Sequence, residues 1–205
     1  MRSGRWTYEV LIMDDRSEDG TDQVVQEQAA LCPVELVVRD GFRDLSLAVL
    51  DGLKRARGNV LLVMDADLSH PPEQIPDLLA TLETPGVDFV IGSRFVAGGQ
   101  TQAWGGHRWL NSYIATLLCR PLARGARDPM SGFFALRRNT YRQAKGFDPI
   151  GYKIGLELIC RCRCSTIREI PIIFHNRVEG ESKLNLRQQS RYLIHLNRLY
   201  RDCRP

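Results

Sequence analysis

The sequence of 205 residues lacks an apolar run long enough to span a membrane, and it lacks a recognisable secretory signal. Asp65 ends the apolar run 60–64 and His175 ends the run 170–174, whereas a membrane-spanning helix needs about 20 apolar residues. Residues 1–6 include basic side chains but no apolar segment of the kind that a signal peptide contains. These absences favour a cytoplasmic protein.

The sequence also lacks any pair of cysteines in Cys-x-x-Cys spacing, although it contains six cysteines. Cys160, Cys162 and Cys164 alternate with arginines, which is not the spacing of a zinc site. Without a secretory signal, disulfides are not expected either. We therefore expect reduced thiols with a structural role.

Charge of one sign is not in large excess, because 28 basic and 24 acidic residues leave a net charge of +4. A nucleic-acid-binding protein usually has a stronger basic excess or a basic stripe, so we expect no nucleic-acid partner. Most of the basic residues are arginines, whose planar guanidinium suits phosphate recognition. A genome rich in G and C would produce the same bias.

What the sequence does contain is an ordinary globular composition, with 43% hydrophobic and 25% charged residues. Short runs rich in valine and isoleucine alternate with helical patterns, which is typical of β-α units around a mainly parallel sheet. The expected strands cover residues 8–13, 34–38, 59–64, 88–91, 133–136 and 167–174. The expected helices begin near Thr21 or cover residues 45–57, 71–84, 108–118 and 154–164. We therefore predict a Rossmann-like α/β fold, with helices flanking the sheet and no linker between domains.

Acidic side chains follow two of the expected strands, at the edge of an open α/β sheet where ligands bind. Asp14 and Asp15 follow the first strand, and Asp65 and Asp67 follow the central one. Side chains at i and i+2 of an extended segment point the same way, so Asp65 and Asp67 can converge on one cation. Their oxygens suit magnesium or manganese. The alternative is structural: Asp67 caps the next helix and Asp65 accepts backbone donors.

Longer strings around these residues carry a family resemblance. Residues 63–73, VMDADLSHPPE, resemble the metal-binding loop of family 2 glycosyltransferases, specifically of the dolichol- or polyprenol-phosphate mannose synthase group. Residues 14–21, DDRSEDGT, are similar to a turn of the same family. Further matching segments follow in family order at 92–95, 128–133, 151–157 and 177–184. The resemblance covers roughly 190 residues, and several motifs in order make coincidence a poor explanation.

The resemblance implies a GT-A-like three-layer fold over residues 1–185, in which Mg²⁺ or Mn²⁺ holds the diphosphate of a nucleotide sugar. The implied metal ligands are Asp65, Asp67 and Ser69. The implied donor-binding residues are Asp15, Asp65, Ala66, Asp67, Arg94 and Lys183, and the implied acceptor-phosphate residues are Arg108, Ser112, Arg177 and Ser182. The implied catalytic set is Asp65, Asp67, Arg94 and Asp128. Asp128 could orient the acceptor, act as a base for a hydroxyl acceptor, or only form an Asp-Pro turn.

The implied reaction is transfer of a hexose, mannose by best resemblance, from a nucleotide sugar such as GDP-mannose to polyprenyl or dolichyl phosphate. Such an acceptor already carries an anionic oxygen, so it needs no strong base. One in-line displacement would invert the anomeric centre. Two alternatives stay open: an inactive remnant that binds nucleotide or membrane, and a haloacid-dehalogenase-type phosphatase. That phosphatase class usually has a threonine after the second aspartate and a later acidic pair. Both are missing here, where Leu68 and Ser69 follow Asp67, and this counts against it.

One departure from the family concerns its opening strand, which ends in a Pro-x-Tyr-Asn-Glu-like turn. Residues 1–7 contain no match to it. We expect either a truncated version of a longer enzyme or a protein that has lost part of its donor pocket. In both cases a sheet edge would be left exposed.

The C-terminal residues 186–205 predict a basic amphipathic helix. At about 100° per residue, arginines 187, 191, 198 and 201 share one face. The opposite face carries Tyr192, Leu193, Leu196, Leu199 and Tyr200, whereas Ile194 falls outside it. Such a helix can lie at an anionic membrane surface, or it can pack on the domain. We expect a peripheral location at the cytosolic membrane face, with a membrane-anchoring subunit or segment as a possible further partner.

Overall fold

The computed structural model describes residues 6–101, 106–144, 146–175 and 186–203. Its strands are β1 (Val10–Asp14), β2 (Val34–Val38), β3 (Val60–Val63), β4 (Phe89–Ser93), β5 (Gln100–Thr101), β6 (Phe134–Arg137), β7 (Ile167–Pro171) and β8 (Ile173–Phe174). Its α-helices are α1 (Thr21–Ala29), α2 (Leu45–Arg55), α3 (Ile75–Glu83), α4 (Gly106–Cys119), α5 (Arg138–Gln143), α6 (Ile154–Arg161) and α7 (Leu186–Asp202). A short 3-10 helix, Pro72–Gln74, precedes α3. The predicted α/β fold is confirmed.

The central sheet has four strands in the order β3-β6-β4-β7. Strands β4 and β7 are parallel, whereas β6 runs antiparallel to both of its neighbours. Strands β3, β4 and β7 therefore run in the same direction, and β6 is the one antiparallel strand of this mainly parallel sheet. The expected strand 167–174 is divided into two strands, because its first part, β7, pairs with β4 and its last part, β8, pairs with β5.

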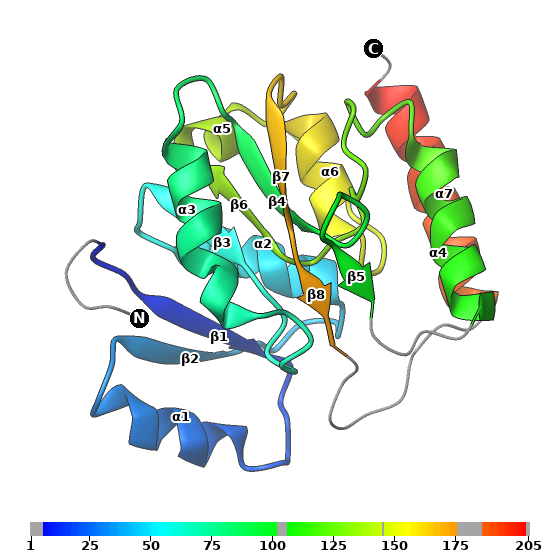
Figure 1. Cartoon of the computed structure of the whole chain (residues 1–205). Helices are drawn as coiled ribbons and strands as arrows, with labels where there is room; N and C mark the ends of the chain where they lie inside the picture. The colour runs from blue at the N-terminus through cyan, green and yellow to red at the C-terminus, as the bar shows by residue number, and fades with distance from the viewer. Residues whose placement is uncertain (1–5, 102–105, 145, 176–185, 204–205) are drawn as a thin grey trace.

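Alternate side chains of the central strands enter different cores, which gives the sheet a helical layer on each face (Figure 1). Phe89 and Ile91 of β4 pack with α2 and α6, whereas Val90 packs with α3. In β6, Phe134 packs on the first side and Ala135 on the second. This period of two is the expected consequence of the strand pleat. The predicted three layers are thus present around the central sheet.

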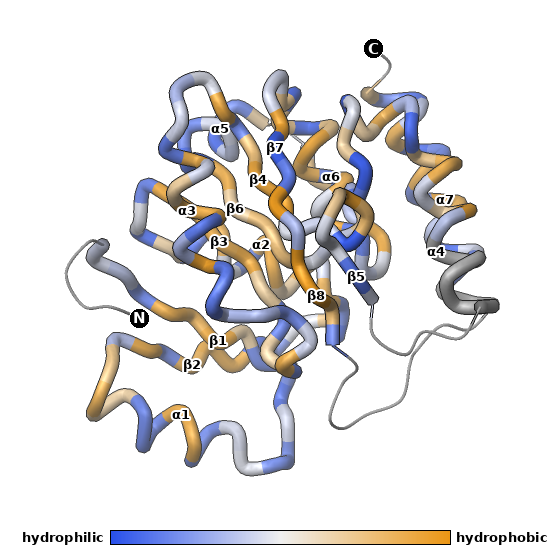
Figure 2. The backbone as a smooth tube through the Cα atoms, in the orientation of Figure 1, coloured by the Kyte–Doolittle hydropathy of each residue, from blue (hydrophilic) through white to orange (hydrophobic). Residues whose placement is uncertain are grey.

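Helix α7 packs on α4 and α6 at one side of the molecule (Figure 1). Tyr192, Leu196 and Leu199 are buried there, together with Cys119 and Leu122. In Figure 2, apolar (orange) and polar (blue) stretches alternate along the coloured parts of α4 and α7. The apolar face that the sequence analysis offered to a membrane is therefore largely covered by the protein. The division between residues 1–185 and 186–205 stays a prediction.

Strands β1 and β2 form a separate two-stranded parallel sheet beside α1. Among the described residues, β1 pairs only with β2, and β3 pairs only with β6. Val10 of β1 and Val60 of β3 are 38% and 39% exposed, although valine is usually buried. Within the described residues, β1 and β3 therefore each have one unpaired edge, in line with the expected exposed sheet edge.

Candidate active site

The candidate site lies at one edge of the central sheet, where three segments meet. Strands β3 and β4 are both antiparallel to β6, so their carboxyl ends lie beside the start of β6. Asp65 follows β3, Arg94 follows β4, and the segment 128–133 leads into β6. Edges of this kind are where open α/β sheets bind ligands. The topology therefore brings three of the predicted motifs together.

Asp65 lies between a glycine and a histidine. A side chain at Gly132 would place its Cβ 3.4 Å from Asp65 Oδ1 and 3.3 Å from His70 Cε1, so the missing side chain leaves room for both. The Asp65 backbone N–H donates to His70 Nδ1 at 3.2 Å. Burial lowers the pKa of His70 below its usual value, against the opposing effect of the nearby Asp65 charge. The neutral imidazole is therefore the favoured form.

The turn after Asp65 presents further oxygen atoms. Asp67 Oδ1 accepts the Ser69 backbone N–H at 3.1 Å. Leu68 between them has φ of +59°, which is costly for a residue with a branched side chain and is typical of functional loops. Ser69 is fully buried, and among the described residues its hydroxyl oxygen has no hydrogen-bond partner.

These donors fit a hard divalent cation, because they are two carboxylates and an unpaired buried hydroxyl. Within the described part of the chain, no group of three or more His, Cys, Asp or Glu side chains is placed to hold a metal by itself. Oxygens from a bound diphosphate and from water would therefore have to complete the shell. Ala66, between the two aspartates, is exposed.

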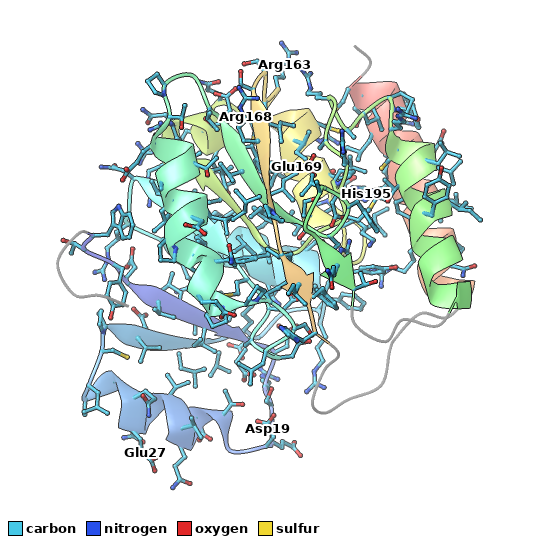
Figure 3. The ribbon with its side chains drawn as sticks, in the orientation of Figure 1. Asp19, Glu27, Arg163, Arg168, Glu169 and His195 are labelled. Atoms are coloured by element: carbon cyan, nitrogen blue, oxygen red, sulfur yellow. The ribbon has the colours of Figure 1, made fainter. Side chains whose placement is uncertain are left out.

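Arg94 is held by Asp128. Its backbone N–H, Nε and Nη2 donate to the Asp128 carboxylate at 2.9, 2.7 and 2.6 Å. The Asp128 side chain is fully buried and the Arg94 side chain is 8% exposed. Glu169 of β7, labelled in Figure 3, accepts the backbone N–H groups of Arg127 and Asp128 at 2.8 and 2.9 Å. Both Asp128 oxygens are thus occupied by Arg94, which favours an orienting role over that of a base.

Lys153 is a residue to which the sequence analysis gave no role. It follows Gly151 and Tyr152 in a matching family segment, and its Nζ lies 4.5 Å from the centre of the Tyr152 ring. Burial, with a smaller contribution from the positive charge of Arg94, lowers its pKa to about 8. A partly desolvated ammonium next to Arg94 is suited to binding an anion. A lysine within a motif of apolar and aromatic residues was the signal that could have identified it.

The acids after β1 serve mainly the local structure. Asp14 accepts the Ser17 backbone N–H at 2.9 Å and the Ser17 hydroxyl at 2.5 Å, which fixes the turn. Asp15 forms an ion pair with the buried Arg39, which also binds Asp51 at 2.9 Å. The predicted contact of Asp15 with a nucleotide would therefore have to share this carboxylate with Arg39.

Several predicted site residues cannot be placed in this geometry. Arg108 and Ser112 lie in α4, but their side chains are outside the described part of the structure. Arg177, Ser182 and Lys183 lie outside the described residues altogether. The predicted acceptor-phosphate group and one donor contact stay predictions for this reason.

Comparison with known proteins gives a consistent result. Residues 5–144 match the family model described as glycosyl transferase family 2. The chain is 42% identical over 195 residues to a dolichol-phosphate mannosyltransferase of Pyrococcus furiosus, covering 94% of this chain and 55% of that protein. It is 38% identical over 204 residues to the enzyme of the same name from Saccharomyces cerevisiae, covering 94% and 74%. The chain thus spans little more than half the length of the first of these relatives.

A solved structure shares the fold. Glucosyl-3-phosphoglycerate synthase from Mycobacterium tuberculosis, in complex with Mn²⁺, UDP-glucose and phosphoglyceric acid, superposes with a TM-score of 0.63 at 20% identity. The superposition covers 94% of this chain and 68% of that one. This likeness shows a GT-A-like fold, as the sequence predicted. With the family model matched over most of the chain and relatives at these identities, the chain belongs to glycosyl transferase family 2.

Proposed function

We propose that this chain transfers a hexose, mannose by its resemblance, from a nucleotide sugar to a polyprenyl phosphate. GDP-mannose is the favoured donor. The observation that carries the proposal is the meeting of Asp65, Asp67 and Arg94 at one edge of the central sheet. The names of the similar enzymes support mannosyl transfer and a dolichol phosphate acceptor.

The residues of the site have separable tasks in this reaction. Asp65, Asp67 and the orphaned hydroxyl of Ser69 would hold a divalent cation, and a cation bound there would neutralise charge on the leaving nucleoside diphosphate. Arg94, kept in one orientation by Asp128, and Lys153 add positive charge for the phosphate groups. An acceptor phosphate oxygen attacks the anomeric carbon as the bond to the diphosphate breaks. No proton has to be removed, and the centre inverts.

We infer that the exposed apolar side chains of α4 and α7 form the face that meets the lipid acceptor. The hydroxyls of Tyr192 and Tyr200 in α7 each donate at 2.6 Å to carbonyls of α4, at Ala115 and Leu118, so the two helices lie side by side. Six apolar side chains of these helices are between 43% and 53% exposed: Tyr113, Ile114, Leu117, Leu118, Leu193 and Ile194. No described helix is long and apolar enough to cross a bilayer. We infer that this face lies against the cytosolic surface of a membrane.

The donor site is tested with Asp65→Ala and Asp67→Ala, with Asp77→Ala as an exposed control on α3. We expect Mn²⁺-dependent binding of GDP-mannose and transfer to a polyprenyl phosphate in wild type and control only, with unchanged thermal unfolding in all. Binding without transfer in the wild type would favour an inactive remnant. Release of phosphate from simple phosphomonoesters would favour a phosphatase.

The membrane face is tested by co-sedimentation with phospholipid vesicles. The Leu117→Ser and Ile194→Ser pair of changes should reduce binding severalfold, because each removes apolar area from the face. Leu31→Ser is the matched control, since Leu31 is 80% exposed and lies in the turn after α1, outside this face. Equal loss of binding in the control would refute the assignment of this face.

A further inference from the structure

His70 occupies a position between the metal-binding turn and the core. It is 2% exposed. Its ring stacks on Phe133, with 5.4 Å between ring centres, and meets Phe174 edge-on at 5.3 Å. These contacts fix the plane and the position of the imidazole, so its nitrogen atoms have defined directions.

One of those nitrogens is committed to the backbone of Asp65. Because the Asp65 N–H donates to His70 Nδ1, Nδ1 is the unprotonated acceptor and the ring proton lies on Nε2. The same Nδ1 is 3.8 Å from Asp65 Oδ2, beyond hydrogen-bond distance. The imidazole therefore holds the main chain of Asp65 and leaves its carboxylate oxygens available to a ligand.

The turn that follows needs such support. Leu68 lies in the left-handed region at φ +59°, and a strained conformation persists only where its surroundings determine it. At its far end, the turn is held by the Asp67 contact to the Ser69 N–H and by the Ser69 carbonyl, which accepts the His175 N–H at 3.0 Å. The hydrogen bond from the Asp65 backbone N–H to His70 Nδ1 joins the first residue of the turn to the residue that follows Ser69.

We propose that His70 is a positioning residue for the metal site: its Nδ1 holds the Asp65 main chain so that the carboxylates of Asp65 and Asp67 converge on one cation. This inference rests on the proposed function, because it assumes that Asp65 and Asp67 bind the cation. This role differs from a purely structural one, because packing against Phe133 and Phe174 requires only an aromatic ring at position 70 and not the acceptor Nδ1. Partners that orient a metal ligand typically contribute about 10- to 100-fold to metal affinity.

The test compares His70→Phe, which keeps an aromatic ring but removes the acceptor, with His70→Asn, which keeps an acceptor where Nδ1 stands. Phe133→Leu is the packing control, since it removes a stacked ring and leaves the acceptor in place. The first measurement is the Mn²⁺ concentration that half-saturates binding of GDP, or of UDP if the wild type binds that instead, by calorimetry. The second is the ¹⁵N spectrum of the metal-free wild type, which reports the tautomer of His70.

We expect His70→Phe to need about 10-fold more Mn²⁺, His70→Asn to stay within about threefold of the wild type, and Phe133→Leu to lose stability without this shift. The ¹⁵N spectrum should show an unprotonated Nδ1. An unchanged Mn²⁺ requirement in His70→Phe, an equal shift in Phe133→Leu, or a protonated Nδ1 would overturn the inference alone. If His70→Phe does not fold, the inference is decided by the Mn²⁺ requirement of His70→Asn and by the His70 tautomer seen in the ¹⁵N spectrum. A wild type that binds nucleotide without Mn²⁺ would overturn the proposed metal site, and this inference with it.

Discussion

Because the ion pair of Arg94 and Asp128 is buried, we predict that Asp128→Asn lowers the free energy of unfolding. The carboxylate accepts three hydrogen bonds from Arg94 and has no exposed surface. An asparagine of the same shape loses the negative charge and turns an NH₂ group or a neutral oxygen toward the guanidinium. The Arg94 side chain, 8% exposed, then loses the carboxylate that accepts its Nε–H and Nη2–H.

Removing one partner of a buried ion pair costs about 3–5 kcal/mol of unfolding free energy, because the remaining charge stays desolvated. For a chain of this size, each kcal/mol shifts Tm by about 2–4 °C, so Asp128→Asn should lower Tm by about 6–20 °C. The exposed pair of Arg198 and Asp148 is the matched control, with side chains 37% and 63% exposed. Asp148→Asn should cost less than about 1 kcal/mol.

The assay is urea denaturation of Asp128→Asn, Arg94→Met and the double variant. The two single changes should together cost at least about 2 kcal/mol more than the double change, because the double variant leaves no unpaired buried charge. Additive effects would refute the view that Asp128 acts through Arg94. So would a stable Asp128→Asn protein that binds donor normally but is inactive, since that result would indicate a general base.

Three further residues, Lys153, Leu199 and Gly92, can be tested by single substitutions. The pKa of Lys153 is lowered to about 8 from 10.5, so its charge is lost as pH rises through about 8: nucleotide binding should weaken above this pH in the wild type, and Lys153→Met should remove that pH dependence. Between about pH 8 and 10.5, Lys153 is still protonated in the unfolded chain but has lost its proton in the folded protein. The free energy of unfolding in urea should therefore rise with pH over this interval in the wild type, but not in Lys153→Met. Leu199 is fully buried where α7 docks, so Leu199→Ala should cost about 2–5 kcal/mol by thermal unfolding, and a cost under about 0.5 kcal/mol would indicate an undocked helix. A Cβ at Gly92 would lie 2.7 Å from Phe133 Cδ1, so Gly92→Ala should destabilise the core by about 1–3 kcal/mol.

Local elements could be predicted because their signals are local. The strand 34–38 has the predicted bounds, and the helix from Leu45 begins where Asp44 accepts the N–H groups of Ser46 and Leu47. The helix ends at Arg55 rather than 57 because Ala56 adopts an extended conformation. The direction of β6 could not be predicted, since a continuous apolar run such as residues 133–136 is the same in both directions.

Only those residues of the candidate site that belong to a sequence motif could be predicted. The spacing of Asp65 and Asp67, and the arginine after β4, identified residues that the fold does bring to one edge. Their partners were not predictable, because Asp128 lies 34 residues from Arg94 along the chain and no periodicity links them. His70 and Lys153 were missed as site residues for the same reason: their roles depend on contacts made in three dimensions.

Helix α7 shows why a helical wheel cannot assign a membrane face by itself. The wheel separates arginines from apolar residues correctly, but it does not say what each face meets. Arg191 binds Asp44 at 2.8 Å and Arg198 binds Asp148, so these charges are used within the protein. The exposed apolar side chains of α7 are Leu193 and Ile194, and the wheel placed Ile194 off the apolar face. Any attraction of this surface to lipid should therefore be mainly apolar, and because salt screens only charges, added salt should weaken it little.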